Sequence, residues 1–234
     1  MKLLIIAGPP SAGKTAVVRQ IISNFNPLKK CSYLKIDVVR AFEDEELREE
    51  FKIPAKKVCS GDLCPDHAGL LVMRDAVDWA YENGSDILIV ESAGLCLRCS
   101  PYTTQSLGLA VLSAISGTNS PLKMSAMLAL SDAAIVTRVD LVSQAEKEVF
   151  REKIKEVKKS LDIIETNAVT GTGLRYLFRA IENLPDIKNP DEIVLRGSPP
   201  LGVCTVCAGK KEIGWENHFG VIRKLDGDFF FRGD

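Results

Sequence analysis

One short motif constrains this chain more than any other feature of its sequence. An apolar run from Leu3 to Ala7 leads into Gly-Pro-Pro-Ser-Ala-Gly-Lys-Thr, residues 8–15, and an amphipathic stretch follows. A Gly-x4-Gly-Lys-Thr motif between a buried strand and a helix wraps its backbone N–H groups around phosphate oxygens, and the helix adds the positive end of its dipole. The motif therefore predicts a phosphate-binding loop near the start of an α/β fold.

The side chains of this loop have distinct expected roles. Lys14 is expected to reach the β and γ phosphates of a nucleotide, and the Thr15 hydroxyl is expected to bind Mg²⁺. The remaining nucleotide contacts are expected from the rest of the loop and the first turn of its helix, at Gly8, Pro10, Ser11, Ala12, Gly13 and Ala16.

The rest of the chain alternates short apolar runs with longer amphipathic stretches, a pattern typical of parallel strands joined by crossover helices. We expect strands at 3–7, 33–36, 87–90, 109–114, 133–137 and 162–166. We expect helices at 13–23, 43–51, 68–82, 144–160 and 173–183. The predicted fold class is α/β, a doubly wound, mostly parallel sheet of about six to seven strands.

Composition predicts how the chain is divided. At 234 residues, 46% of them hydrophobic, the chain is long enough for one α/β core and a small appended module. After Leu184 the stretch is polar and is interrupted by four prolines, Pro185, Pro190, Pro199 and Pro200. We therefore predict a P-loop domain over residues 1–185 and a C-terminal extension over residues 186–234.

Charge and segment composition narrow the class of partner. The 30 basic and 31 acidic residues give a net charge of -1, which offers no electrostatic footprint for nucleic acid or an anionic membrane. The N-terminal apolar run does not resemble a signal peptide, and no apolar stretch approaches the roughly 20 residues that span a bilayer. We expect a cytoplasmic protein without nucleic-acid or membrane partners, in which the seven cysteines stay reduced.

Two carboxylates follow apolar runs at positions where open α/β sheets bind their ligands. Asp37 follows the run that ends at Ile36, and Glu91 follows Ile87 to Val90. Either could hold Mg²⁺ or its water. Glu91 also begins Glu-Ser-Ala-Gly, and Gly94 would let the backbone approach a γ-phosphate.

Two later turns are candidates for contacts to the base. The strand predicted at 133–137 runs into Thr137, Arg138 and Asp140, and a carboxylate there can accept two hydrogen bonds from the N1–H and N2–H₂ edge of guanine. The turn after the last predicted strand contains Asn167, Ala168 and Val169. Because adenine lacks that donor pair, these turns favour GTP over ATP.

The motifs together resemble the nickel-handling GTPases that mature hydrogenase and urease, within the signal-recognition and MinD class of P-loop proteins. The resemblance covers about residues 3–184. It rests on the loop at 8–15, FKIPAKKVCSGDLCPDHA at 51–68, Glu-Ser-Ala-Gly at 91–94, SGTNSPLKM at 116–124 and the turns at 137–140 and 167–174.

This resemblance implies a GTP-dependent homodimer that delivers metal to a client metalloenzyme or to its maturation factor. It implies that Asp37 and Glu91 lie near Mg²⁺ and the catalytic water, and that Cys64 and His67 belong to a metal-binding segment. The chain also departs from the family pattern. Asp66 separates Pro65 from His67 where urease-type proteins read Cys-Pro-His, Thr137-Arg138 replaces the usual Asn-Lys, and with two histidines the chain has no nickel-storing tract.

Four cysteines cluster in the two segments expected to flank the nucleotide. We expect Cys59 and Cys64 in one loop, and Cys96 and Cys99 form a Cys-x-x-Cys just beyond Glu91. Soft thiolates favour Ni²⁺, Zn²⁺, Cu(I) or an Fe–S cluster over Mg²⁺. Three interpretations stay open here: inert buried thiols, a transition-metal site completed by dimer closure, and an Fe–S cluster bridging two chains.

The extension carries a second candidate metal site. Cys204 and Cys207 form another Cys-x-x-Cys, and Gly209 permits the tight turn of a metal knuckle. His218 could be a third ligand. A small tail stabilised by a bound zinc ion is the simplest structural interpretation, because a segment this short has too small a core to be stable without one.

The hypothesis with the widest support is a GTPase that couples dimer closure to capture and release of a soft metal, with nickel favoured. Lys14, Asp37 and Glu91 are its predicted catalytic residues, and GTP and Mg²⁺ its predicted cofactors. One alternative is a redox activator in which hydrolysis drives electron transfer from an Fe–S cluster. A small-molecule kinase is another, because the same loop occurs in that class.

Overall fold

The computed structural model describes residues 1–38, 42–60, 65–93, 101–197, 213 and 229–230. Their centre is an eight-stranded sheet in the order β7-β6-β5-β1-β4-β2-β3-β8, and every neighbouring pair is parallel. The strands are β1 Lys2–Ala7, β2 Cys31–Asp37, β3 Ala55–Cys59, β4 Ile87–Ser92, β5 Leu107–Ser113, β6 Ala133–Thr137, β7 Asp162–Thr166 and β8 Phe229–Phe230. The predicted α/β class and parallel sheet are confirmed.

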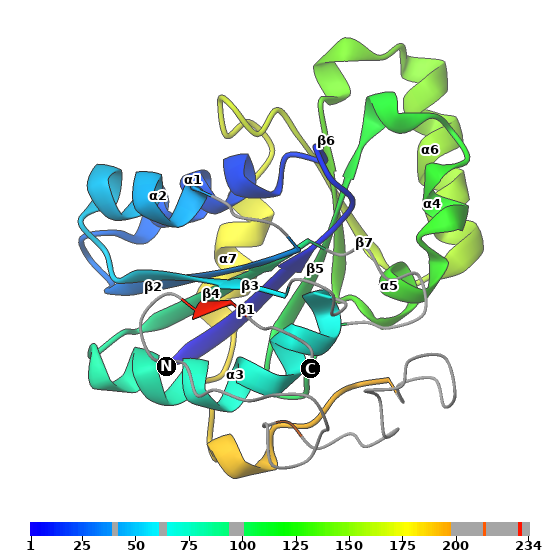
Figure 1. Ribbon diagram of the computed structural model, residues 1–234. Helices are drawn as coiled ribbons and strands as arrows, with labels where there is room; N and C mark the ends of the chain where they lie inside the picture. Colours follow the sequence, from blue (N-terminus) through cyan, green and yellow to red (C-terminus); the bar gives the residue numbers. More distant parts are fainter. Residues whose placement is uncertain (39–41, 61–64, 94–100, 198–212, 214–228, 231–234) are drawn as a thin grey trace.

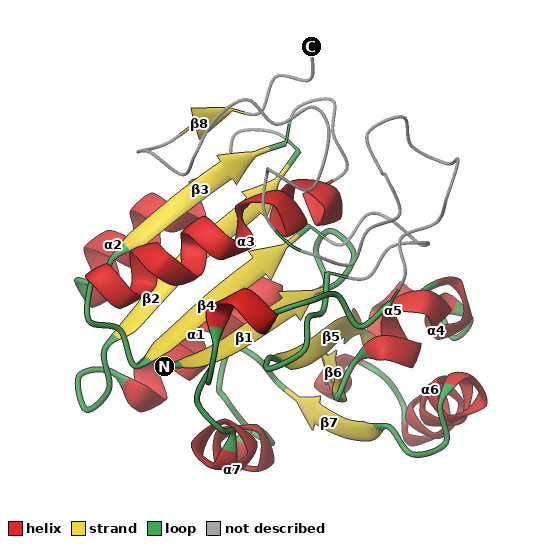
Figure 2. Cartoon of the chain, turned by 90° about the horizontal axis from the view of Figure 1, so that it is seen from below, coloured by secondary structure: helices red, strands yellow, loops and turns green. Residues whose placement is uncertain are grey.

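Helices cover both faces of this sheet, as Figures 1 and 2 show. They are α1 Lys14–Phe25, α2 Glu43–Phe51, α3 Pro65–Glu82, α4 Ser120–Lys123, α5 Ser125–Leu130, α6 Gln144–Val157 and α7 Arg175–Asn183. Residues of α1, α2 and α7 share one buried cluster with the sheet, and residues of α3, α5 and α6 share the other. The central strands are mostly apolar on both sides because helices bury both sides.

The order of the strands brings the expected ligand-binding positions together. β1 lies between β5 and β4, so the loop after β1 adjoins the carboxyl ends of both neighbours. The chain order reverses at this point, which is where open α/β sheets bind ligands. The phosphate loop therefore lies at the centre of the sheet edge.

Two strands, β3 and β8, were not predicted from the sequence pattern. β3 reads Ala-Lys-Lys-Val-Cys, and its two lysines make it look like an exposed segment in the sequence. The Lys57 ammonium lies 2.8 Å from a Glu45 carboxylate oxygen, and the Lys56 ammonium lies 5.5 Å from the centre of the Trp79 ring. Both positive charges therefore have partners from neighbouring helices, which allows a lysine-rich strand. β8 pairs with the outer side of β3.

Residues just after the predicted domain boundary pack on the large domain. Ile187, Ile193 and Leu195 are buried in the cluster that also contains α3, and the Ile187 N–H donates to the Met1 carbonyl over 2.9 Å. Leu195 also forms an isolated antiparallel bridge with Thr103. The extension as far as residue 197 is thus continuous with the main core, and the boundary near residue 185 stays a prediction.

Candidate functional site: a phosphate loop above a buried ion network

The loop at residues 8–15 joins the end of β1 to the start of α1, as its motif predicts. Ser11 and Gly13 adopt left-handed backbone conformations with φ of 59° and 91°. At Gly8 a Cβ atom would lie 2.2 Å from the carbonyl oxygen of Val111 on β5, so no larger residue fits there without movement of the backbone. Tight packing on β5 therefore supports the loop.

Lys14 is folded onto its own loop in this structure. Its ammonium donates to the carbonyl oxygens of Gly8 at 2.8 Å and Pro9 at 3.0 Å. Burial lowers the pKa of Lys14 below its ordinary value, although the negative charge of Glu91 opposes this shift. A phosphate bound in the loop would offer this ammonium a charged acceptor in place of two neutral carbonyls.

Glu91 lies directly below the loop and is fully buried in β4. The Thr15 hydroxyl lies 3.0 and 3.1 Å from its two carboxylate oxygens, and the Tyr33 hydroxyl donates to it over 2.8 Å. Burial, followed by the charge of Glu91, raises the pKa of Tyr33 well above its ordinary value, so Tyr33 stays protonated and keeps its donor. Glu91 was expected just past a strand, whereas β4 continues through it to Ser92.

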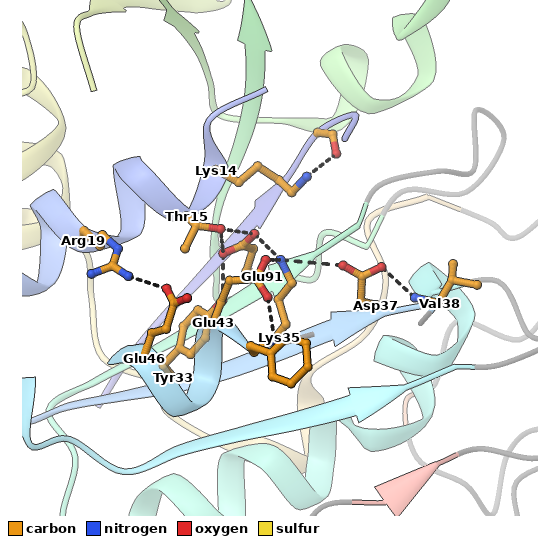
Figure 3. A network of polar contacts seen from close by, with 12 residues as sticks. Lys14, Thr15, Arg19, Tyr33, Lys35, Asp37, Val38, Glu43, Glu46 and Glu91 are labelled. Atoms are coloured by element: carbon orange, nitrogen blue, oxygen red, sulfur yellow. Dashed lines mark hydrogen bonds and ion pairs between the residues drawn. The ribbon is translucent and has the colours of Figure 1, made fainter. Parts of the chain in front are cut away.

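A buried lysine balances the charge of Glu91. The Lys35 ammonium lies 2.6 Å from a Glu91 oxygen, 3.3 Å from a Glu43 oxygen and 3.7 Å from an Asp37 oxygen, as Figure 3 shows. Burial alone would lower the pKa of Lys35, but the charge and hydrogen bond of Glu91, helped by Glu43 and Asp37, raise it. The lysine therefore stays charged.

Sequence reasoning missed both Tyr33 and Lys35. Alternate residues of a strand share one face, so Tyr33, Lys35 and Asp37 point the same way from β2. The register of the sheet places Lys35 beside Glu91 of β4. The available signal was a lysine within the apolar run at 33–36, two residues before a predicted metal ligand.

The two predicted base-contacting turns lie at the carboxyl ends of β6 and β7, on the same edge as the phosphate loop. Asp140 is exposed in a short 3₁₀ turn, Val139–Leu141. The Asn167 side chain accepts from the backbone N–H groups of Val169 and Thr170 at 3.0 and 3.2 Å, which holds the second turn in shape. Their role toward a base stays a prediction.

Thr137 makes a different contact from Asp140. It is buried, and its hydroxyl lies 2.6 Å from the carbonyl oxygen of Ala12 in the phosphate loop. Arg138 adopts a left-handed conformation with φ of 57°, and its guanidinium lies 3.3 Å from the Ser113 hydroxyl on β5. In this structure Thr137 ties the phosphate loop to β6.

Replacing Thr137 with valine tests this hydrogen bond between β6 and the phosphate loop. Valine keeps the size of the side chain but removes the donor to the Ala12 carbonyl, and we expect the free energy of unfolding to fall by about 1–3 kcal/mol. Urea denaturation of the parent, Thr137→Val and Thr137→Ser proteins measures it, since serine keeps the hydroxyl. A valine variant as stable as the serine variant would contradict the assignment.

The predicted soft-metal ligands fall partly outside the described residues. Cys64, Cys96 and Cys99 lie there, as do the second-site residues Cys204, Cys207 and His218 and the predicted γ-phosphate contact Gly94. Cys59 is described, and it is a buried residue at the end of β3, which corrects its expected place in a loop. His67 lies in the first turn of α3 and is 5% exposed.

Asp66, the residue that departs from the family pattern, also has a defined place. It is buried in the first turn of α3 and accepts a hydrogen bond from the Ser92 hydroxyl over 2.7 Å. Ser92 directly follows Glu91 on β4. Asp66, which lies between Cys64 and His67 of the predicted metal-binding segment, is therefore hydrogen-bonded to the strand that carries Glu91.

Two negative findings concern the described ranges alone. Within them, no three His, Cys, Asp or Glu side chains come together as a ready metal site. None of the described helices combines the length and apolarity that crossing a membrane would take.

Comparison with known proteins supports the sequence resemblance. A model of the CobW/HypB/UreG nucleotide-binding domain matches residues 2–165. An uncharacterized protein of Methanocaldococcus jannaschii is 39% identical over 236 residues and is matched along 100% of both chains. The hydrogenase/urease maturation factor HypB of Helicobacter pylori is 26% identical over 164 residues, which are 68% of this chain and 64% of HypB, just under two thirds of its length.

A solved structure agrees with this assignment at the level of the fold. HypB from Helicobacter pylori in complex with nickel has a TM-score of 0.60 to this chain at 19% identity, over 81% of this chain and 91% of that one. The family model covers most of the chain, and its match includes the phosphate loop, Lys35 and Glu91. The chain therefore belongs to the CobW/HypB/UreG family of nucleotide-binding proteins.

Proposed function

We propose that this protein is a GTP-hydrolysing metallochaperone that inserts a soft transition metal, with nickel favoured, into a client metalloenzyme through nucleotide-dependent dimerisation. The observation that carries the proposal is the contact between Thr15 of the phosphate loop and Glu91 of β4. β4 leads, a few residues later, into the segment with Cys96 and Cys99. One strand thus connects the nucleotide site with the predicted thiol ligands.

The loop supports nucleotide binding directly. The Lys14 ammonium is already placed at the loop, and an entering phosphate would replace its contacts to the Gly8 and Pro9 carbonyls. Thr15, Asp37 and Glu91 supply hydroxyl and carboxylate oxygens, the ligand class that Mg²⁺ prefers, so these residues fit that ion and would hold it. Bound Mg²⁺ would neutralise charge on the phosphates.

The proposed reaction is hydrolysis, with water as the acceptor of the γ-phosphoryl group. The bond from the γ-phosphorus to the bridging oxygen breaks, a bond to the water oxygen forms, and the water proton leaves to phosphate or solvent. Lys14 stabilises negative charge on the transferred group. Glu91 is held in one orientation by Thr15, Tyr33 and Lys35, so the site needs little rearrangement.

The position and charge of Asp140 support guanine as the proposed base. Its exposed carboxylate stands at the end of β6, and a carboxylate can accept from both donors of the guanine edge. The turn at 167–170 lies at the end of the neighbouring strand and is linked to α1, because the Gln20 side chain donates to the Val169 carbonyl over 2.9 Å. We therefore assign GTP as the nucleotide.

Nickel, the client and the dimer are proposed from the relatives and the thiols together. The Helicobacter pylori relative is a hydrogenase/urease maturation factor, and its structure was solved with nickel. Thiolates of Cys64, Cys96 and Cys99 suit soft metals, and two chains closing on each other would double the ligand set. The client is then a metalloenzyme or its maturation factor.

Metal affinity should depend on the bound nucleotide. We expect the dissociation constant for Ni²⁺, measured by anaerobic equilibrium dialysis, to differ at least about tenfold between protein with a GTP analogue and protein with GDP, a coupling of typical size. Cys96→Ala is expected to abolish this difference, and Cys204→Ala serves as the matched control for the second thiol pair. Equal affinity with the analogue, with GDP and without nucleotide would overturn the proposal.

A further inference from the structure

Lys35 occupies the centre of the acidic group below the phosphate loop. Its side chain is 4% exposed, and its ammonium lies 2.6 to 3.7 Å from carboxylate oxygens of Glu91, Glu43 and Asp37. These carboxylates come from three elements, β4, the first turn of α2 and the end of β2. Figure 3 shows the three side chains converging on the ammonium beside Thr15.

Three carboxylates this close repel one another strongly unless a cation lies between them. The ammonium supplies that cation without any metal. Its hydrogen bond to Glu91 also leaves the Glu91 carboxylate in contact with the Thr15 hydroxyl. The same oxygens and the Thr15 hydroxyl are of the class that hard divalent cations prefer, and around the ammonium they do not stand in a ready metal geometry.

We propose that Lys35 is a positioning and specificity residue. Its ammonium is a permanent counter-ion that holds Glu91 below Thr15, and it prevents divalent cations from binding the three carboxylates until nucleotide phosphates are bound. The proposal rests on the proposed function, since it concerns the same site. Mg²⁺ is usually bound through one or two carboxylates together with substrate phosphates. The phosphates would supply further negative charge and oxygen ligands. These would hold Mg²⁺ against the repulsion of the ammonium.

This role has a consequence for a protein that handles a second metal. Without the ammonium, the three carboxylates would be free to close on a divalent ion, and affinity for simple oxygen ligands does not by itself select one metal. With the ammonium in place, a free cargo ion finds no such site in the hydrolytic centre. Lys35 thereby separates the Mg²⁺ of the nucleotide from the metal cargo.

Binding of Mn²⁺ to the nucleotide-free full-length chain tests the proposal. Mn²⁺ prefers oxygen ligands over thiolates, so it reports on the carboxylates, and its EPR signal distinguishes free from bound ion. We expect the parent protein to bind Mn²⁺ only weakly, and Lys35→Met to bind it at least tenfold more tightly. Lys35→Arg keeps the positive charge and is expected to behave like the parent.

Two controls identify the site of any new binding. Adding Glu91→Gln to Lys35→Met is expected to remove the gain, because the central carboxylate is lost. Lys57→Met removes another buried ammonium, whose partners Asp44 and Glu45 lie on α2, and is expected to keep the affinity of the parent. An equal gain in Lys57→Met, or a gain that survives Glu91→Gln, would overturn the proposal.

Two further outcomes would also overturn it. One is an unchanged affinity in Lys35→Met. The other needs no variant, and so holds even if Lys35→Met does not fold: the nucleotide-free parent binding Mn²⁺ with micromolar affinity, a binding that Glu91→Gln abolishes. Neither nucleotide nor nickel is present in these measurements. Failure of GTP hydrolysis or of nickel coupling would therefore overturn the proposed function and leave the Mn²⁺ result standing.

Discussion

Lys14→Met is expected to lower the rate of GTP hydrolysis by at least about a hundredfold, the usual effect of removing one group that stabilises transition-state charge. The ammonium of Lys14 is the cation of the phosphate loop, and it lies within 3.0 Å of two loop carbonyls that a phosphate would displace. Methionine has a similar length and no charge. Release of phosphate from GTP under saturating nucleotide measures the effect.

The same substitution is expected to leave the fold intact. Burial lowers the pKa of Lys14, which means that the folded protein disfavours the charged form relative to water. Replacing this ammonium with an apolar group relieves that cost and gives up two hydrogen bonds to carbonyls, so we expect the free energy of unfolding to change by at most about 1 kcal/mol. Lys30→Met, at an exposed lysine before β2, is the control and is expected to hydrolyse GTP at the parent rate. A Lys14→Met protein with more than a tenth of the parent activity would contradict the assigned role.

Glu91→Gln is expected to have the largest effect on stability. Removing this charge leaves the buried Lys35 ammonium without its nearest carboxylate, and breaking a buried ion pair from one side costs about 3–5 kcal/mol. Because Glu43 and Asp37 still face the ammonium, we expect a value near the lower end, about 3 kcal/mol. Guanidinium denaturation of the nucleotide-free protein measures it.

A double-mutant cycle separates this ion pair from other effects of the substitution. Lys35→Met and Glu91→Gln together remove both charges, so their combined cost is expected to be smaller than the sum of the single costs by at least about 1 kcal/mol. Additive costs would show that the two side chains do not stabilise each other. A loss below about 1 kcal/mol in Glu91→Gln alone would contradict the burial argument.

Most of the fold follows from local patterns. The apolar runs of β1, β6 and β7 predict their strands within a residue or two, and the helix expected at 43–51 coincides with α2. β3 could not be predicted in this way, because it carries two lysines whose charges find partners only on other elements. The short helices α4 and α5 have too few turns to show a periodic pattern.

The candidate site was also predicted from the sequence only in part. Gly8, Lys14 and Thr15 belong to one contiguous motif, and Asp37 and Glu91 were found as carboxylates at the ends of apolar runs. Lys35 and Tyr33 were not found, because the contacts that define them join residues 56 and 58 positions apart in the chain. The soft-metal ligands at Cys64, Cys96 and Cys99 stay predictions from spacing.

By itself, the sequence determined the phosphate loop and the α/β fold that carries it. The reason is physical: a strand, a Gly-rich turn and a helix are set by neighbouring residues, and the loop binds phosphate through its own backbone. The tertiary structure alone decided what lies beneath the loop. Only the order β1-β4-β2 and its register place Lys35 beside Glu91, and only the packing of α2 brings Glu43 to the same ammonium. Charges from separate elements interact only after the chain has folded.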